Sequence, residues 1–264
     1  MRGTWHVRDA HAVQYSLSPV EGGAYGEMYA QEDSHWWFRG RRYMIWALLR
    51  HSDLPDRPRI LDAGCGTGRN LVEFGMLGPA MGIDASSEAV EFCKLRGLGM
   101  VSTGTVHSLP FGSGEFDLLL ACDVLEHVQH DVLALTELNR VAGRGAHLVI
   151  TAPAYQWMWT EHDVQLHHVR RYTLRVLRSR ARAAGWEIVH DTYFNTILLP
   201  PAAFARVISK KWARRGRTDL DRTPAPLNGI LAFPLRLEAA AVARGARLPA
   251  GVSVGLLCRK AAPG

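Results

Sequence analysis

From about residue 59 the chain alternates short apolar runs with amphipathic stretches. The apolar runs predict strands, and the stretches between them, with apolar positions three and four apart, predict helices. We expect strands at 59–63, 80–84, 99–104, 116–121 and 145–151, and helices at about 68–77, 86–96 and 130–142. Leu118–Ala121 is unbroken by polar residues, as in a parallel strand buried on both faces. This alternation predicts an α/β fold on a mostly parallel sheet.

Further elements follow the alternating region. Thr173 is expected to cap a helix that Gly185 stops after Ala184. Strands are expected near 186–193 and at 252–259. The prolines between these strands punctuate two apolar helical pieces, so a long insertion separates the strands of a hairpin.

The chain is expected to form one domain, 1–264, of a size that buries a full α/β core. Its parts are an N-terminal lid region (1–55) with one or two helices over Tyr25–Arg50, a core (56–195), a helical cap insertion (196–249) and a final strand (250–260). We expect the insertion to cover the mouth of the active site or to form a dimer contact.

Composition limits the class of protein. Apolar residues make up 47% of the 264 residues and charged residues 21%, which is ordinary for a globular protein. We expect no transmembrane helix and no secretory signal, since neither pattern occurs. The cysteines Cys65, Cys93, Cys122 and Cys258 are scattered, which is typical of reduced thiols in a cytoplasmic protein.

Positive charge is concentrated towards the end of the chain. Residues 1–195 hold 19 Lys and Arg against 22 Asp and Glu, whereas residues 196–264 hold 12 against 3. The densest run, Lys210–Arg217, is either a solvated helix end or a contact for an anionic lipid headgroup, a phosphorylated carrier or nucleic acid. Few aromatic residues surround it, which disfavours nucleic acid. A peripheral membrane contact through 206–217 stays a hypothesis.

A glycine-rich turn follows the first expected strand. Ile60–Ala63 leads into Gly-Cys-Gly-Thr-Gly at 64–68, and the next strand ends at Asp84. Such glycines allow positive φ and close approach of a ligand, and Asp84 is placed to accept hydrogen bonds from both ribose hydroxyls. A phosphate-binding loop would need a Lys after the glycines, and a dinucleotide motif would need a wider last gap. Unless the turn is merely structural, the two segments predict a site for S-adenosyl-L-methionine (SAM).

Residues 62–68 resemble motif I of class I SAM-dependent methyltransferases, in particular the type 11 methyltransferase family. Segments 82–86, 109–117 and 123–128 resemble its other motifs in the same order. The resemblance covers roughly residues 25–195. It implies an α/β, Rossmann-like sheet of seven strands in the order 3-2-1-4-5-7-6, with the last strand antiparallel and lid helices at the N-terminus.

The resemblance also implies which residues bind the cofactor SAM. They lie in the glycine turn, at the second strand end and in two later loops: Asp62, Ala63, Gly64, Cys65, Gly66, Gly68, Asp84, Ala85, Thr105, Val106, His107, Cys122, Asp123 and Val124. The chain departs from the family at Thr105, where an Asp often accepts from the adenine amino group. Adenine recognition then rests on Thr105, on backbone groups near Val106 and His107, or on stacking.

A second cluster of polar residues follows the fifth expected strand, at the sheet edge where acceptors bind. His-Val-Arg-Arg-Tyr-Thr at 168–173 resembles a segment found in a subset of the type 11 family. Candidate catalytic residues are His168 as general base, His162, His167 and Tyr172; Asp163, Arg170 and Arg171 are candidate acceptor-binding residues. Alternatively, this is a helix-capping loop whose Arg and Asp residues pair with each other. His162, Asp163, His167 and His168 are the residues considered for a metal site, but we expect no metal there, because adjacent histidines rarely ligate one ion together.

Trp36, Trp37 and Arg39 are expected to line the pocket from a lid helix, although Trp37 at helical spacing is also typical of core packing. The expected reaction is O-methylation of a sugar, a glycolipid or a small secondary metabolite. Two alternatives stay open. One is a methyltransferase-fold cyclase or isomerase that uses SAM structurally, and the other is a non-catalytic SAM-binding module with a basic face for a membrane or partner.

Overall fold

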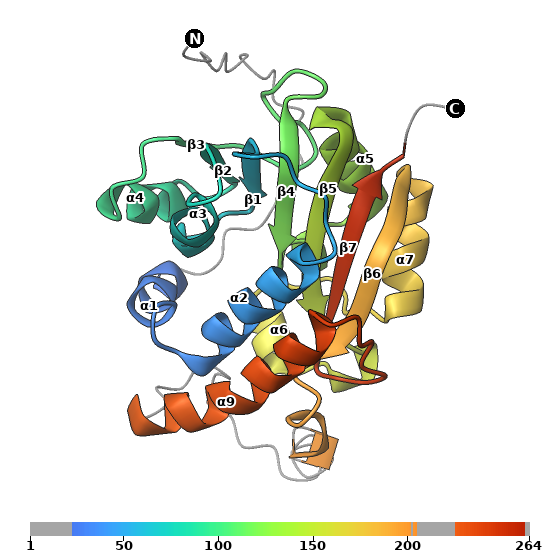
Figure 1. The fold of residues 1–264 in the computed structure, drawn as a ribbon. Helices are drawn as coiled ribbons and strands as arrows, with labels where there is room; N and C mark the ends of the chain where they lie inside the picture. Colours follow the sequence, from blue (N-terminus) through green and yellow to red (C-terminus); the bar gives the residue numbers. More distant parts are fainter. Residues whose placement is uncertain (1–22, 202, 205–224, 262–264) are drawn as a thin grey trace.

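The structure of the protein is a computed structural model, and it describes residues 23–201, 203–204 and 225–261. Its centre is a seven-stranded sheet in the order β3-β2-β1-β4-β5-β7-β6 (Figure 1). The strands are β1 (Ile60–Ala63), β2 (Ala80–Asp84), β3 (Val101–Thr103), β4 (Phe116–Cys122), β5 (Ala142–Pro153), β6 (Trp186–Phe194) and β7 (Ser253–Lys260). The pairings from β3 to β5 are parallel, whereas β7 runs antiparallel to β5 and β6. The expected fold and strand order are confirmed.

Helices cover both faces of the sheet (Figure 1). They are α1 (Ala24–Gln31), α2 (Trp36–Leu49), α3 (Arg69–Phe74), α4 (Ser87–Leu95), α5 (Asp131–Val141), α6 (Glu161–Gln165), α7 (Leu174–Ala183) and α9 (Ala225–Val242), with short 3-10 turns η1 (Leu125–His127) and η2 (Gln156–Met158). Apolar residues of α5 and α7 form one core with the sheet, and those of α2, α3 and α9 form a second core on the opposite face. Among the described helices, none is long and apolar enough to cross a membrane.

Local signals account for several element ends. The hydroxyl of Thr173 accepts a hydrogen bond from the Val176 amide at the start of α7, and Gly185 follows the helix with φ of +83°. Ser86 caps α4 in the same way, accepting from the Ala89 amide. The expected caps at Thr173 and Gly185 are confirmed.

Two expectations about elements are wrong in detail. The fifth strand begins at Ala142 rather than 145, because α5 passes into it directly and Phe116 pairs with Ala142. Pro234 does not interrupt the insertion but lies inside α9. Packing maintains this helix: Leu235 faces Gly40 of α2 so closely that a Cβ on Gly40 would lie 2.2 Å from a methyl of Leu235.

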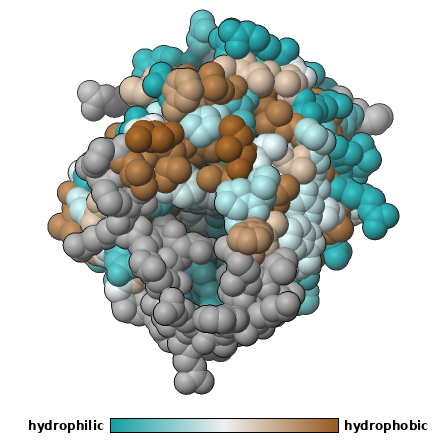
Figure 2. Space-filling model, turned by 90° about the horizontal axis from the view of Figure 1, so that it is seen from below, coloured by the Kyte–Doolittle hydropathy of each residue, from teal (hydrophilic) through white to brown (hydrophobic). Residues whose placement is uncertain are grey.

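The outward side of α9 is also apolar. Leu227, Ile230, Phe233 and Leu237 are 46–66% exposed, while Leu235, Ala239 and Val242 are buried against the body of the protein. Apolar residues gather on the face seen from below in Figure 2. A dimer contact by the insertion stays a prediction, and the basic run Lys210–Arg217 lies outside the described residues.

Candidate functional site

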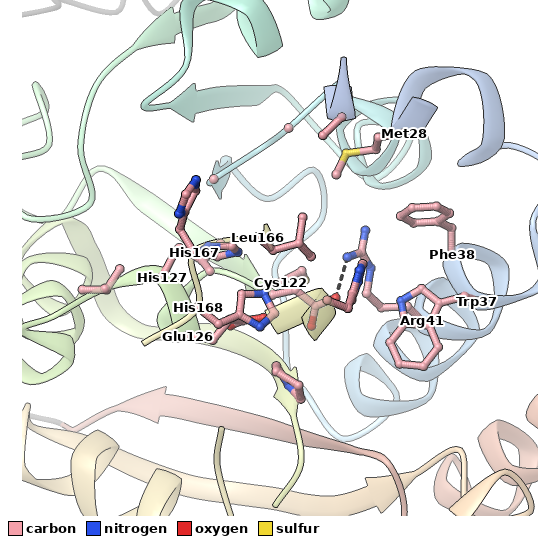
Figure 3. A pocket seen from close by; sticks show the side chains of 18 of the residues that line it. Met28, Trp37, Phe38, Arg41, Cys122, Glu126, His127, Leu166, His167 and His168 are labelled. Atoms are coloured by element: carbon pink, nitrogen blue, oxygen red, sulfur yellow. Dashed lines mark hydrogen bonds and ion pairs between the residues drawn. The ribbon is translucent and has the colours of Figure 1, made fainter. Parts of the chain in front are cut away.

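A cavity of about 740 Å³ lies where β1, β2, β4 and β5 end at their carboxyl termini. Parallel strands of an α/β sheet create such a crevice because their following loops diverge there. Helices α1 and α2 line it from one side and the loop around α6 from the other, as Figure 3 shows for part of the wall. Leu198 and Pro201 add the first residues of the insertion to this wall.

The glycine turn gives the cavity a close-fitting backbone floor. Gly64 has φ of +82°, and a Cβ there would lie 2.4 Å from a methyl of Val124. Gly66 has φ of +53°, and its amide donates to Asp84 Oδ2 at 2.8 Å. Both positions therefore require glycine, and the amides of the turn are tied to the end of β2.

The carboxylate of Asp84 is held at the cavity wall by backbone amides. Besides Gly66, the Ser86 amide donates to its Oδ1 at 2.9 Å, and the hydroxyl of Tyr25 also bonds to it. Burial raises the pKa of Asp84, while these hydrogen bonds act in the opposite direction. Tyr25 places α1 directly over this strand end.

Nine of the predicted cofactor-binding residues line the cavity: Gly64, Cys65, Gly66, Asp84, Ala85, Val106, Cys122, Asp123 and Val124. Five predicted residues are not part of its wall: Asp62, Ala63, Gly68, Thr105 and His107.

These five residues have other positions and contacts. Asp62 and Ala63 are fully buried in β1 below the turn, and Gly68 caps α3. The hydroxyl of Thr105 bonds to the ring and the amide of His107, so a contact of Thr105 with adenine stays a prediction, beside the alternatives of backbone groups and stacking. Gly104 and Val106 lie at the cavity in its place.

The lid helix presents Trp37 and Arg41 to the cavity, with Trp36 and Phe38 beside them. The expected contribution of Arg39 is wrong, because its guanidinium donates to the Tyr43 hydroxyl at 3.1 Å, away from the cavity. Arg41 was missed from sequence, although it follows Trp37 by four residues and thus shares its helix face. Nη1 of Arg41 lies 2.7 Å from Asp123 Oδ2, and Asp123 Oδ1 accepts from the Thr151 hydroxyl.

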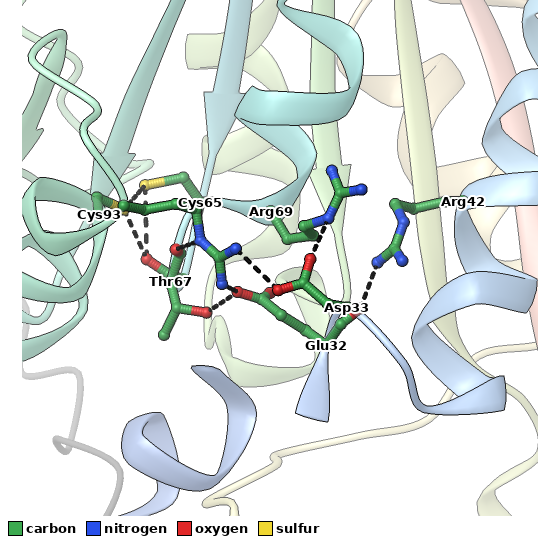
Figure 4. Close-up of polar contacts among 9 residues, drawn as sticks. Glu32, Asp33, Arg42, Cys65, Thr67, Arg69 and Cys93 are labelled. Atoms are coloured by element: carbon green, nitrogen blue, oxygen red, sulfur yellow. Dashed lines mark hydrogen bonds and ion pairs between the residues drawn. The ribbon is translucent and has the colours of Figure 1, made fainter. Parts of the chain in front are cut away.

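A polar cluster fastens the lid to the glycine turn (Figure 4). Buried Glu32 accepts from the Thr67 hydroxyl and from Arg96 at 2.6 Å. Asp33 pairs with Arg69 at 2.5 Å and with Arg96 at 3.1 Å. Because Glu32 and Asp33 join α1 to α2, the cluster holds both helices over the glycine turn.

His162, His167 and His168 line the far end of the cavity, as expected for residues that meet an acceptor. The Nδ1 of His168 lies 2.8 Å from Asp163 Oδ1. An anionic carboxylate accepts only, so Nδ1 carries the proton and the lone pair belongs to Nε2. His168 is thus oriented as a candidate general base.

Asp163 positions this loop and is not exposed to an acceptor. It is fully buried, and Arg171 pairs with it in bidentate fashion at 2.7 and 2.8 Å. Thr160 donates to it as well, capping α6. Although burial opposes ionisation, these partners together lower the pKa of Asp163. The expected acceptor contact of Asp163 is wrong, and the alternative of an Arg–Asp pair in a capping loop is confirmed for this pair.

Two more candidates have structural contacts. Tyr172 is fully buried outside the cavity wall, and its hydroxyl donates to Asp131 at 2.9 Å and to the Leu125 carbonyl at 3.1 Å. Arg170 pairs with the same Asp131 at 2.9 Å. A catalytic role of Tyr172 and an acceptor contact of Arg170 are therefore wrong. Arg171 does reach the cavity wall while paired with Asp163.

Comparison with known proteins places this site in context. Residues 61–150 match the model of a protein family described as methyltransferase domain. Norajmaline N-methyltransferase of Rauvolfia serpentina is 33% identical over 129 residues, which are 43% of this chain and 44% of that protein. An uncharacterized methyltransferase of Schizosaccharomyces pombe is 31% identical over 182 residues, or 60% of this chain and 65% of that protein.

Solved structures resemble the fold at lower identity. The crystal structure of the cyclase SpnF gives a TM-score of 0.55 at 21% identity, covering 84% of this chain and 81% of that chain. The matched regions span between 38% and 65% of the length of the first curated relatives.

Proposed function

We propose that this chain, a member of the class I SAM-dependent methyltransferases, transfers a methyl group from SAM to a hydroxyl of a small molecule. The class of acceptor is a sugar, a glycolipid or a small secondary metabolite. The observation that carries the proposal is one continuous cavity with a nucleoside-binding floor at one end and an oriented imidazole at the other.

The residues at the floor fit SAM. Gly64 and Gly66 leave room for a ligand against the backbone, and Asp84 offers a carboxylate at the position where a ribose is held in this kind of fold. Arg41 has donors beyond the one that bonds Asp123, and these suit the carboxylate of the methionine part. When bound, SAM supplies an electrophilic methyl group on a sulfonium and leaves as S-adenosylhomocysteine (SAH).

The far end of the cavity fits an acceptor with apolar surface and a hydroxyl. Trp37, Met158 and Leu166 provide apolar walls. His168, oriented by Asp163, accepts the hydroxyl proton at Nε2 while the oxygen attacks the methyl carbon. The proton thus moves to the imidazole, and the electron pair of the broken carbon–sulfur bond stays on sulfur.

Likeness to an N-methyltransferase favours an amine as the second candidate acceptor. A neutral amine attacks through its own lone pair, so its methylation depends less on a base. The effect of removing His168 therefore separates the two acceptor classes.

The test measures cofactor binding and turnover separately. SAH is titrated calorimetrically, and methyl transfer from labelled SAM is assayed on panels of hydroxyl and amine compounds. We expect His168→Ala to lower kcat about 10²–10⁴-fold with an unchanged dissociation constant for SAH. His130→Ala, at an exposed position outside the cavity wall, is the control and should keep full turnover.

Each contrary result has a distinct meaning. Full turnover in His168→Ala with an alcohol rejects His168 as the base. SAH binding without turnover on any panel supports the non-catalytic module. Product that forms without release of SAH supports a cyclase or isomerase.

A further inference from the structure

Three side chains at the acceptor end of the cavity converge without a shared hydrogen bond. One ligand-type atom each from Glu126, His127 and His168 lies within 4.8 Å of the others. Figure 3 shows the three in the same part of the cavity wall. They come from η1 and from the loop after α6, which a hydrogen bond from the Val169 amide to the Glu126 carbonyl joins at 2.7 Å. The backbone therefore fixes their spacing.

Both imidazoles are held through one nitrogen. His168 uses Nδ1 on Asp163, and His127 bonds to the backbone carbonyl of Leu166. Histidines that ligate metals nearly always donate their other N–H to a carboxylate or a carbonyl, which fixes ring orientation and tautomer. The two rings lie 4.6 Å apart at 82°, so they approach from different directions.

Glu126 supplies the third side chain, and a bound cation would give its carboxylate the partner that one of its oxygens lacks among the described residues. Its side chain is 1% exposed, and its Oε2 has no hydrogen-bond partner among the described residues. A buried carboxyl oxygen without a partner costs free energy.

We propose that Glu126, His127 and His168 form a binding site for one divalent transition-metal ion at the acceptor end of the cavity. Two imidazoles and one carboxylate make a donor set suited to Zn²⁺, Fe²⁺ or Co²⁺, and it leaves coordination positions open towards the cavity. This differs from the sequence expectation of no metal, which considered His162, Asp163, His167 and His168. The adjacent pair His167 and His168 contributes only its second member.

The proposal deepens the proposed function and rests on it for its role. A bound ion would take the Nε2 lone pair of His168 that otherwise accepts the hydroxyl proton. It would supply a Lewis acid beside the acceptor oxygen, and the hydroxyl proton would then pass to solvent water. Metal-free protein would work through His168, whereas metal-loaded protein would activate the hydroxyl at a lower pH.

The experiment measures metal binding directly on full-length, tag-free protein stripped with a chelator. Zn²⁺ is titrated by equilibrium dialysis, and Co²⁺ by its visible absorption bands. We expect one ion per chain in wild type. We also expect at least a 10-fold loss of affinity in Glu126→Gln, His127→Asn and His168→Ala. Asp163→Asn should lose 10- to 100-fold, because the carboxylate that orients the His168 ring is removed.

The matched control is His162→Gln, which removes a cavity-lining histidine outside the trio and should keep wild-type metal affinity. Retained SAH binding shows that each variant is folded. Absence of bound Zn²⁺ and Co²⁺ from SAH-binding wild type at millimolar ion overturns the site, as does equal binding by all variants. Methyl transfer is scored separately on stripped and on metal-loaded protein: its absence from both forms, with metal binding intact, rejects the proposed function and leaves the metal site standing.

Discussion

Arg41 carries positive charge into the cofactor cavity on a rigid helix. Its side chain is 12% exposed and is held by Asp123, so it is oriented before a ligand arrives. Preorganised guanidinium groups lose less entropy when they bind a carboxylate. Arg41 lines the cavity together with the glycine turn and the loop after β4, which supports its proposed contact with the carboxylate of SAM.

We therefore expect Arg41→Ala to weaken SAH binding by about 1–3 kcal/mol, which is roughly 5- to 150-fold. Arg39→Ala removes the same charge two residues earlier, on the other side of α2, and should change the affinity less than twofold. Calorimetric titration of both variants checks this. Equal losses in the two variants would mean that net charge, and not the position of Arg41, governs binding.

Asp62 belongs to a motif that is recognisable in sequence, but the pKa of its carboxyl depends on its burial in the fold. It is fully buried below the turn, and burial raises the pKa of its carboxyl to about 8, with Asp84 and Glu32 adding to the rise and Arg41 opposing it. Its unfolded pKa is about 3.9. Between these values the folded protein binds more protons than the unfolded chain, so this group lowers stability as pH rises.

Asp62→Asn should remove that dependence on pH. Relative to wild type, we expect its free energy of unfolding to gain about 2 kcal/mol between pH 6 and pH 8 in the absence of cofactor. Urea unfolding at both pH values measures the difference, and taking wild type minus variant cancels the other titrating groups. A parallel pH dependence of the two proteins would show that Asp62 is ionised in the folded state.

Which site residues the sequence could predict depended on what each prediction needed. Gly64, Gly66 and Asp84 were correctly placed at the cavity, because their positions follow from the glycine turn and from the end of a strand. Thr105 and Tyr172 were misplaced because of the hydrogen bonds that their hydroxyls form. The partners of Tyr172 are distant in sequence and that of Thr105 lies in the same loop, and a single sequence does not show these contacts. For the same reason, the sequence did not show that Glu126 and His168 lie close together.

At the level of elements, the core was predicted well because several of its strands are short apolar runs and because local capping signals mark the starts of some of its helices. β4 and α7 are examples of such local agreement. The helix α9 was not foreseen as continuous, because Pro234 argues for a break when its neighbours are unknown. Tertiary contact decides the matter: the small surface of Gly40 lets α9 lie close against α2.

The two helices of the lid region, α1 and α2, differ in how far they are buried. α2 has eight buried residues and a cover of its own in α9, whereas α1 has no buried residue. α1 is held by the Glu32 and Asp33 cluster, by Tyr29 against Phe92 at 5.0 Å, and by Arg96 over the Tyr29 ring at 4.6 Å. We infer that α2 is part of the rigid body and that α1 is the half that opens.

At the scale of the whole molecule, the weaker burial of α1 compared with α2 predicts that cofactor binding and closure of α1 are linked. Tyr25 and Met28 of α1 line the cavity together with the glycine turn, so a bound cofactor contacts both sides and opposes their separation. We expect saturating SAH to slow amide exchange in residues 24–33 about 10-fold or more. Amide exchange by local fraying should change little in α7, which lies beside β6 (Figure 1) and contributes no residue to the cavity wall.

Hydrogen-exchange mass spectrometry of free and SAH-saturated protein makes this measurement, and Glu32→Gln is the variant that tests the cause. Without the charge on Glu32, the contacts of Arg96 and Thr67 weaken, so α1 should exchange faster in the free protein and SAH should bind less tightly. If SAH slows exchange equally in α1 and α7, binding stabilises the fold globally and α1 is no separate lid. If α1 is already protected without ligand, acceptors must enter from the side of the α6 loop, and control of access then belongs to His162, Leu166 and the residues that follow them.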